Sequence, residues 1–133
     1  ARLFGMWIVA PQAMKIMFGK TFLNDPARKS QRAEMRRRLL QNDKINIAKA
    51  IDGVFSRQGV YEYLPSIKTP TLIVVGDEDI ATIPAKSRRM NTAIRGSQLV
   101  VIPHAGHTST LETPDAVTTA IRDFLHNLAL NRV

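Results

Sequence analysis

Two short, unbroken apolar runs stand out in the second half of the chain. Residues 71–75 (Thr-Leu-Ile-Val-Val) and residues 99–102 (Leu-Val-Val-Ile) are each stopped by a glycine or a proline. Runs without polar alternation are typical of strands buried on both faces of a parallel sheet. Between them, residues 84–94 begin with proline and are followed by Gly96, which predicts a helix. The pattern therefore predicts a βαβ unit with two neighbouring parallel strands.

The remaining apolar positions predict further helices. Residues 26–41 form a largely polar pattern that begins with proline and has Asp25 as its predicted N-cap. Residues 45–57 carry apolar side chains at helical spacing, which predicts one buried face. A last helix is predicted to start at Pro114 after the cap residue Thr113, and its apolar stripe should lie on the sheet. The stripe consists of Ala116, Val117, Ala120, Ile121, Phe124, Leu125 and Leu128.

Polar side chains follow both predicted strands. Asp77, Glu78 and Asp79 come after the first strand, and His104 and His107 come after the second. The carboxyl ends of parallel strands meet at one edge of a sheet, where open α/β sheets bind ligands. A carboxylate and an imidazole from adjacent strands can therefore meet there. A carboxylate that orients a histidine is two-thirds of a nucleophilic triad.

Three segments resemble the C-terminal third of the α/β-hydrolase superfamily: residues 70–79 (PTLIVVGDED), 102–107 (IPHAGH) and 112–114 (ETP). The likeness is greatest to bacterial esterases and lactonases similar to 3-oxoadipate enol-lactonases. Gly-x-x-Asp in that family ends in the catalytic acid, which maps onto Asp79, and its Gly-His pair supplies the base, which maps onto His107. Each motif alone is weak evidence, but both in this order after buried strands form a specific combination.

The resemblance also implies roles for the neighbouring polar residues. Asp77 and Glu78 are expected to be solvated or to hold their loop by turn-type hydrogen bonds. His104 is expected to be a loop histidine without a catalytic role. Glu112 is expected to brace the loop that follows His107.

The nucleophile of such a family is missing from these 133 residues. None of the six serines lies in a Gly-x-Ser-x-Gly motif, and the sequence has no cysteine. A hydrolase of this kind needs roughly 200–250 residues as one domain. We therefore expect the chain to be the C-terminal half of a longer enzyme, inactive alone, whose missing half carries a serine that attacks an ester or lactone. An aspartate nucleophile would instead indicate a haloalkane dehalogenase or an epoxide hydrolase.

The resemblance implies a partial α/β-hydrolase fold of class α/β with two parts. Residues 1–64 would form a helical cap, and residues 65–133 would form a βαβα part of the core. The cap is rich in methionine and aromatic residues, which suit an adaptable apolar pocket, although each can equally pack the cap against the core. The candidate substrate contacts are Trp7, Met14, Met17, Phe18 and Thr108.

Composition and charge bear on which kinds of partner the protein could have. The net charge is +8, but the arginines of residues 26–41 have no interleaved aromatic residues, which favours a solvated face over a nucleic-acid site. No apolar stretch is long enough for a membrane span. The expected reaction needs neither metal nor cofactor, and we expect a cytoplasmic protein. A half-sheet with an open edge should pair with the missing half or with a second copy. The alternative to an enzyme is therefore a non-catalytic binding module that pairs with a second chain.

Overall fold

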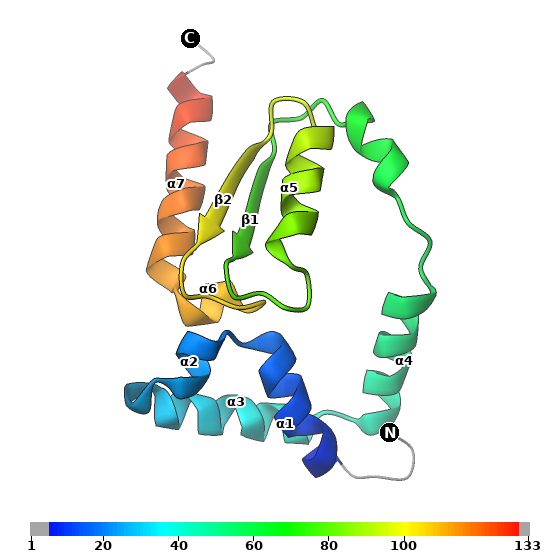
Figure 1. Ribbon diagram of the computed structural model, residues 1–133, viewed down its shortest axis with the longest axis vertical. Coiled ribbons are helices and arrows are strands. Elements are labelled where there is room, and N and C mark those ends of the chain that lie inside the picture. Colours follow the sequence, from blue (N-terminus) through cyan, green and yellow to red (C-terminus); the bar gives the residue numbers. More distant parts are fainter. Residues whose placement is uncertain (1–5, 131–133) are drawn as a thin grey trace.

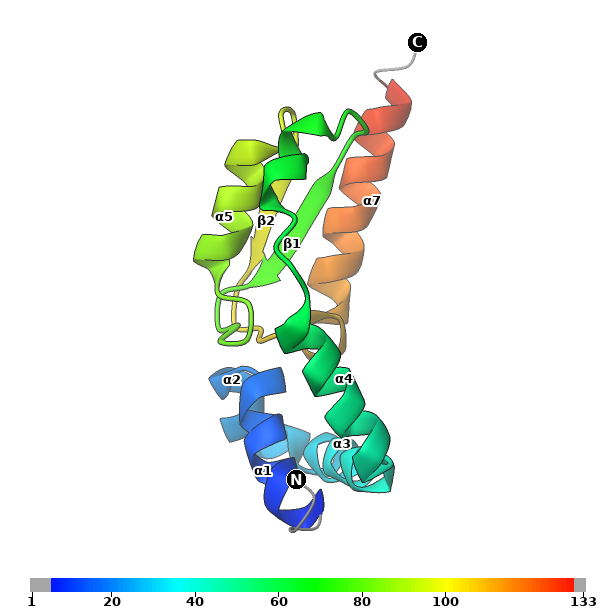
Figure 2. The same cartoon turned by 90° about the vertical axis from the view of Figure 1, so that its right-hand side faces the viewer.

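A computed structural model describes residues 6–130, in which a small parallel sheet with its helices lies above a group of N-terminal helices (Figures 1 and 2). The helices that precede the sheet are α1 (Met6–Met17), α2 (Lys20–Asn24), α3 (Lys29–Gln41) and α4 (Lys44–Ser56), with 3-10 helices η1 (Pro26–Arg28) and η2 (Tyr61–Ser66). The sheet region contains β1 (Leu72–Gly76), α5 (Pro84–Ala93), β2 (Gln98–Ile102), α6 (Ser109–Glu112) and α7 (Pro114–Leu130).

The predicted βαβ unit is confirmed. β1 and β2 are parallel, and their register runs from Leu72 opposite Gln98 to Gly76 opposite Ile102. The two strands therefore end side by side, and α5 crosses over between them. Both strands lie between α5 and α7, which each contact them (Figure 1). The observed bounds differ from the predicted ones by one residue at both ends of β1, at the start of β2 and at the end of α5.

The two faces of the sheet bury different side chains. One cluster joins Ile102 and Ala105 to Val117 of α7, with Val74 and Val100 packed against it. Successive residues of a strand point to opposite faces, so the buried Ile73 and Val75 of β1 lie on the other face. Burial of each such side chain contributes about 1.5–3 kcal/mol. The sheet thus has a core on both faces, as a continuous apolar run predicts.

The N-terminal helices have a core of their own. Met14, Phe18 and Phe22 are buried together, and Met35 and Leu39 of α3 pack against them. The rings of Phe18 and Phe22 are stacked, with centroids 4.7 Å apart. Met14 belongs to α1 and Phe22 to α2, and Phe18 lies in the short connection between the two helices. This cluster holds α1, α2 and α3 together.

The predicted helix over residues 26–41 begins with a 3-10 turn, η1, and becomes α-helical only from Lys29. Asp25 is its N-cap as predicted, because the carboxylate accepts a hydrogen bond of 2.9 Å from the amide of Ala27. The capped 3-10 turn tightens the start of the helix, as is common at helix termini.

The arginines of this region make several intramolecular contacts. Arg28 donates to the carbonyl of Glu112 at 2.5 Å, and Arg32 donates to the carbonyls of Phe22 and Asp25. Hydrogen bonds from Arg37 and then Arg38 lower the pKa of the partly exposed Glu34 to about 2. Part of the basic face therefore stabilises the fold through hydrogen bonds within the chain.

Two expected buried faces are exposed. On α4, Ile51, Val54 and Phe55 are exposed, with Phe55 at 85%, and only Ile47 and Ala48 are half-buried. The predicted burial of this face is therefore wrong for most of it among the described residues. On α7, Val117 is buried, but Ile121 and Leu125 are exposed, with Leu125 at 57%. A two-stranded sheet is too narrow to cover the whole stripe. Among residues 6–130, no helix is long and apolar enough to cross a membrane.

The two groups of elements touch through a pair of glycines. A Cβ atom added to Gly106 would overlap the amide nitrogen of Gly19, and one added to Gly19 would lie 2.6 Å from Oε2 of Glu78. Beside them, the amide of Thr108 donates to the carbonyl of Met17 at 3.0 Å. The loop after β2 and the start of α2 thus approach backbone to backbone.

We expect Gly106→Ala to lower the free energy of unfolding by about 1–3 kcal/mol, as overpacking does. The backbone of Gly19 cannot move aside without separating α2 from the loop. The matched control is Gly53→Ala on α4, where an added Cβ atom meets nothing within 4 Å. Urea unfolding should show the control unchanged or more stable. Equal stability of the two variants would contradict the close contact.

Candidate active site

The acidic loop after β1 is fixed by backbone hydrogen bonds to the loop after β2. The amide of Asp77 donates to the carbonyl of Ile102, and the amide of Glu78 donates to that of Ala105, both at 2.9 Å. Asp79 follows and is only 5% exposed. Its Oδ1 accepts hydrogen bonds of 2.8 Å from the amides of Ala81 and Thr82, which makes an Asx-type turn. The turn points the second carboxylate oxygen toward the neighbouring loop.

The loop after β2 brings His107 to that oxygen. His104 has a φ of 59°, a left-handed conformation in which the chain turns sharply. Ala105 and Gly106 are buried, and the ring of His107 remains about one-third exposed. Nδ1 of His107 lies 3.0 Å from Oδ2 of Asp79. The expected meeting of these two residues at the carboxyl edge of the sheet is confirmed.

The protonation of Asp79 decides the direction of this hydrogen bond. Burial alone would raise the pKa of the Asp79 carboxyl, but hydrogen bonds from Thr82 and His107 outweigh burial and lower the pKa. The carboxylate is therefore ionised near neutral pH and can only accept. Nδ1 of His107 must donate, so in the neutral ring Nε2, on the opposite side, is the acceptor nitrogen.

A third residue of the site, Thr82, was missed by sequence reasoning. Its hydroxyl donates to Oδ2 of Asp79 at 2.8 Å and lies 3.2 Å from Nδ1 of His107. The available signal was the three-residue spacing from Asp79, at which a threonine can return a hydrogen bond to the aspartate.

Glu112 braces the histidine loop, as predicted, and also reaches the N-terminal helices. The side chain is fully buried, with 0% exposure. Its Oε2 accepts hydrogen bonds from the amide of Gly106 at 3.0 Å and from that of Gly19 at 2.8 Å. Oε1 lies 2.9 Å from the hydroxyl of Thr108. One carboxylate thus joins the two groups of elements beside His107.

The other two acidic residues of the first loop differ from each other. Asp77 is exposed. Glu78 accepts hydrogen bonds from the amide of Thr21 at 2.7 Å and from its hydroxyl at 2.6 Å. Burial acts to raise the pKa of Glu78, but the bonds from Thr21 and the charges of Lys20 and His104 lower it. The expected turn-type role of Glu78 is therefore replaced by a long-range contact with α2.

The candidate substrate contacts lie in different surroundings. Trp7 is 66% exposed on α1, whereas Met14 and Phe18 are in the helical core. The hydroxyl of Thr108 lies 3.0 Å from the carbonyl of Met17, so both residues help to join α1 to the histidine loop. Phe18 also lines a cavity of about 290 Å³ at this junction, together with Lys15, Lys20, Leu23, Asp77, Glu78 and Ile80.

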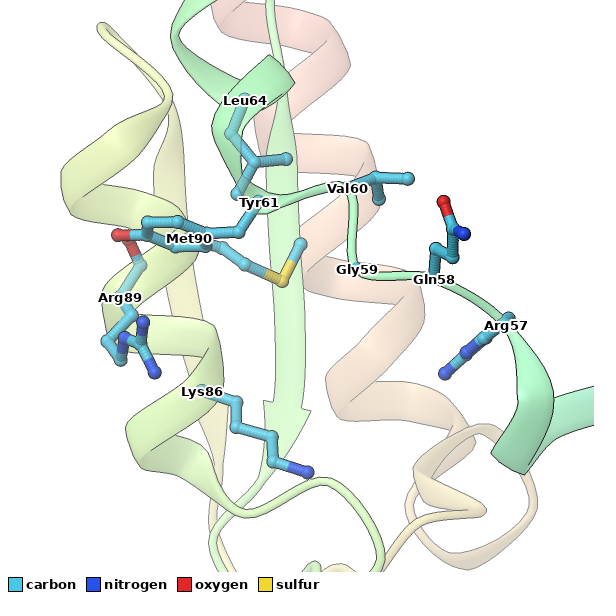
Figure 3. A pocket seen from close by; sticks show the side chains of 9 residues that line it. All are labelled: Arg57, Gln58, Gly59, Val60, Tyr61, Leu64, Lys86, Arg89 and Met90. Carbon is cyan, nitrogen blue, oxygen red and sulfur yellow. The ribbon is translucent and has the colours of Figure 1, made fainter.

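A larger cavity of about 700 Å³ lies between residues 57–64 and α5 (Figure 3). The guanidinium group of Arg89 lies 4.8 Å from the centre of the Tyr61 ring, and Lys86 lines the same cavity. Neither Asp79 nor His107 lines this cavity. Among residues 6–130, no group of three or more His, Cys, Asp or Glu side chains is arranged to hold a metal.

Residues 54–132 match the family model described as TAP-like protein, which is more than half of the chain. The chain belongs to the TAP-like family of α/β-hydrolases. A curated relative of this family member is the provisionally named carbamate hydrolase RutD of Klebsiella pneumoniae, which is 40% identical over 60 residues. The match covers 45% of this chain and 23% of that protein.

Two solved structures resemble nearly the whole TAP-like chain. The enol-lactonase from Burkholderia xenovorans LB400 superposes with a TM-score of 0.83 and 28% identity, covering 94% of this chain and 46% of the lactonase. The thermophilic esterase from Thermogutta terrifontis has a TM-score of 0.81 and 32% identity, covering 95% and 46%. The chain therefore has the fold of part of an α/β-hydrolase and spans less than half the length of these relatives.

The lowered pKa of Asp79 predicts a pH-dependent stability. A carboxyl whose pKa is lowered by folding stabilises the native state above its unfolded pKa, about 3.9 for Asp. That contribution is lost as the pH falls below this value and through the folded pKa. We therefore expect Asp79→Asn to show a smaller loss of unfolding free energy between pH 5 and pH 2 than the unsubstituted chain, as measured by urea unfolding at each pH.

The matched control is Asp52→Asn, which removes an exposed carboxylate of α4. Its stability profile should follow that of the unsubstituted chain. Identical pH profiles for Asp79→Asn and Asp52→Asn would contradict the assigned hydrogen bonds of Asp79.

Proposed function

We propose that this chain supplies the acid and the base of a hydrolase that cleaves carboxylic esters or lactones by Ser-His-Asp catalysis. The observation that carries the proposal is the 3.0 Å contact between Oδ2 of Asp79 and Nδ1 of His107. In a nucleophilic triad, the histidine uses one ring nitrogen to contact the acid and the other to activate the nucleophile. No serine of this chain lies in a nucleophile elbow, so the serine would come from outside these 133 residues.

The reaction would proceed in two steps. Nε2 of His107 takes the proton of the serine hydroxyl as the serine attacks the carbonyl carbon, and then returns it to the departing alcohol oxygen. A water molecule, activated by the same nitrogen, then hydrolyses the acyl-enzyme. Asp79 stays ionised throughout, holds the ring in place and stabilises the imidazolium that forms in each step. This chemistry needs neither a metal nor an organic cofactor.

The names of the similar proteins support the substrate class. An esterase, an enol-lactonase and a carbamate hydrolase all act on a carbonyl carbon bonded to a heteroatom leaving group. We propose residues 1–64 as the cap and residues 65–133 as part of the catalytic core. Substrate would enter at their junction, where the cavity lined by Phe18 lies beside the acidic loop. Trp7, Met14, Met17 and Thr108 stay predicted contacts.

The segment that carries the nucleophile would also complete the sheet. Within residues 6–130, β1 pairs with β2 on one edge and has no strand on the other. Ile121 and Leu125 are exposed on α7, as is Phe55 on α4. We propose that a nucleophile-bearing segment pairs with the open edge of β1 and covers these side chains. A second copy of the chain is the alternative partner.

The isolated chain should not hydrolyse a p-nitrophenyl ester above the buffer rate, because His107 has no nucleophile to activate. The measurement is release of p-nitrophenol by the purified chain at neutral pH. Turnover that disappears in the His107→Ala variant would show that the chain has its own nucleophile and would refute this part of the proposal.

A chimera tests the catalytic pair directly. The first half of the Thermogutta terrifontis esterase, up to the start of the matched region, is joined to this chain, and ester hydrolysis is measured. We expect activity that His107→Ala lowers by several orders of magnitude and that Asp79→Asn lowers by about 10⁴-fold, by analogy with serine proteases.

The matched control for the chimera is His126→Ala, which removes an exposed histidine of α7 and should leave turnover unchanged. Thermal melts establish that each variant is folded. A folded chimera that is inactive, or one that keeps its activity after His107→Ala, would count against the proposed function.

A further inference from the structure

Thr82 contacts both members of the catalytic pair. Its amide donates to Oδ1 of Asp79 at 2.8 Å, and its hydroxyl lies 2.8 Å from Oδ2 and 3.2 Å from Nδ1 of His107. The residue follows Asp79 by three positions and directly precedes Ile83, the N-cap of α5. The start of the crossover helix therefore fixes the position of this hydroxyl relative to the pair.

The hydrogen bonds of Asp79 use every acceptor position of its carboxylate. An ionised carboxylate offers about four such positions, two on each oxygen. The amides of Ala81 and Thr82 occupy Oδ1, and the Thr82 hydroxyl and His107 occupy Oδ2. A hydroxyl has only one proton. If that proton points at Oδ2, the lone pairs of the threonine oxygen remain for His107.

This arrangement discriminates between the two neutral forms of the imidazole. A protonated Nδ1 finds two acceptors, the Asp79 carboxylate at 3.0 Å and the Thr82 oxygen at 3.2 Å. An unprotonated Nδ1 would face the lone pairs of Asp79, and it could gain a donor only if Thr82 turned its proton away from the carboxylate. Either outcome sacrifices a hydrogen bond to a charged group, which contributes about 1.5–3 kcal/mol.

We propose that Thr82 is a positioning residue that fixes the Asp79 carboxylate and holds His107 in the tautomer protonated at Nδ1. The residue acts through the pair and not on the substrate. Its importance for turnover rests on the proposed function, because that tautomer leaves Nε2 free to accept the proton of a nucleophile. Its effect on the ring does not rest on turnover and is measurable in the chain itself.

The test compares Thr82→Val, which replaces the hydroxyl by a methyl group of similar shape, with the unsubstituted chain. The ¹⁵N shifts of the His107 ring report the tautomer at a pH where the ring is neutral. We expect the ratio of the Nδ1-protonated form to the Nε2-protonated form to fall by about tenfold. The reason is that the protonated Nδ1 loses the Thr82 oxygen, one of its two acceptors, and so loses one hydrogen bond. In a ¹³C titration, the pKa of Asp79 should rise.

Three further variants separate the hydroxyl from other effects. Thr82→Ser restores the hydroxyl and should restore both the tautomer ratio and the titration of Asp79. Thr82→Ala removes the hydroxyl without adding a methyl group. It should shift the tautomer ratio in the same way as Thr82→Val, which would exclude poor packing of the valine as the cause. Thr92→Val is the matched control, since that hydroxyl donates to the carbonyl of Arg88 on the surface of α5, and it should change neither signal.

An unchanged tautomer ratio in Thr82→Val and Thr82→Ala would overturn the proposal, as would a failure of Thr82→Ser to restore it. Unfolding of both hydroxyl-free variants would overturn it too, since the hydroxyl would then serve the fold. In the active chimera, Thr82→Val should lower kcat with little change in KM. An inactive chimera with a shifted tautomer in Thr82→Val would refute the hydrolase function and leave the role of Thr82 intact.

Discussion

The geometry of the site depends on the hydrogen bonds that the carboxylate of Glu112 accepts. It is fully buried, and its Oε2 accepts the amides of Gly19 and Gly106, which belong to different halves of the structure. A buried amide without a partner costs about 1–3 kcal/mol, so this one oxygen offsets two such penalties. Because Gly106 directly precedes His107, the same carboxylate that attaches the N-terminal helices also holds the backbone next to His107.

Three buried or half-buried carboxylates lie at this junction, and each accepts hydrogen bonds from different donors. Glu112 accepts from backbone amides of two loops, Glu78 accepts from Thr21 at the start of α2, and Asp79 accepts from Thr82 and His107. Of these three carboxylates, only Asp79 has an imidazole as a hydrogen-bond partner. Burial opposes the ionisation of Glu78 and Asp79, and hydrogen bonds restore it for both. Its hydrogen-bond partners thus distinguish Asp79 from the two glutamates at this junction.

The sequence contained the information for the local parts of this arrangement. Unbroken β-branched runs predicted both strands, and the parallel register brought Asp79 and His107 to one edge. The contacts of Thr21 with Glu78 and of Gly19 with Glu112 join residues 57 and 93 positions apart, and no local pattern predicts such pairs. The apolar periodicity of α4 predicted a buried face that residues 6–130 do not cover. Periodicity identifies a surface that needs burial but not the partner that buries it.

The site is held by many contacts within the chain even though much apolar surface around it is open. The turn from Asp79 to Thr82 and the loop ending at His107 are held by backbone amides, by Glu112 and by the pairing of β1 with β2. None of these contacts involves the exposed faces of α4 and α7 or the open edge of β1. Asp79 and His107 are therefore held in position by contacts among residues 6–130 alone. Such pre-organisation would lower the cost of assembling the proposed triad, because the proposed nucleophile-bearing segment would need to orient only its own serine.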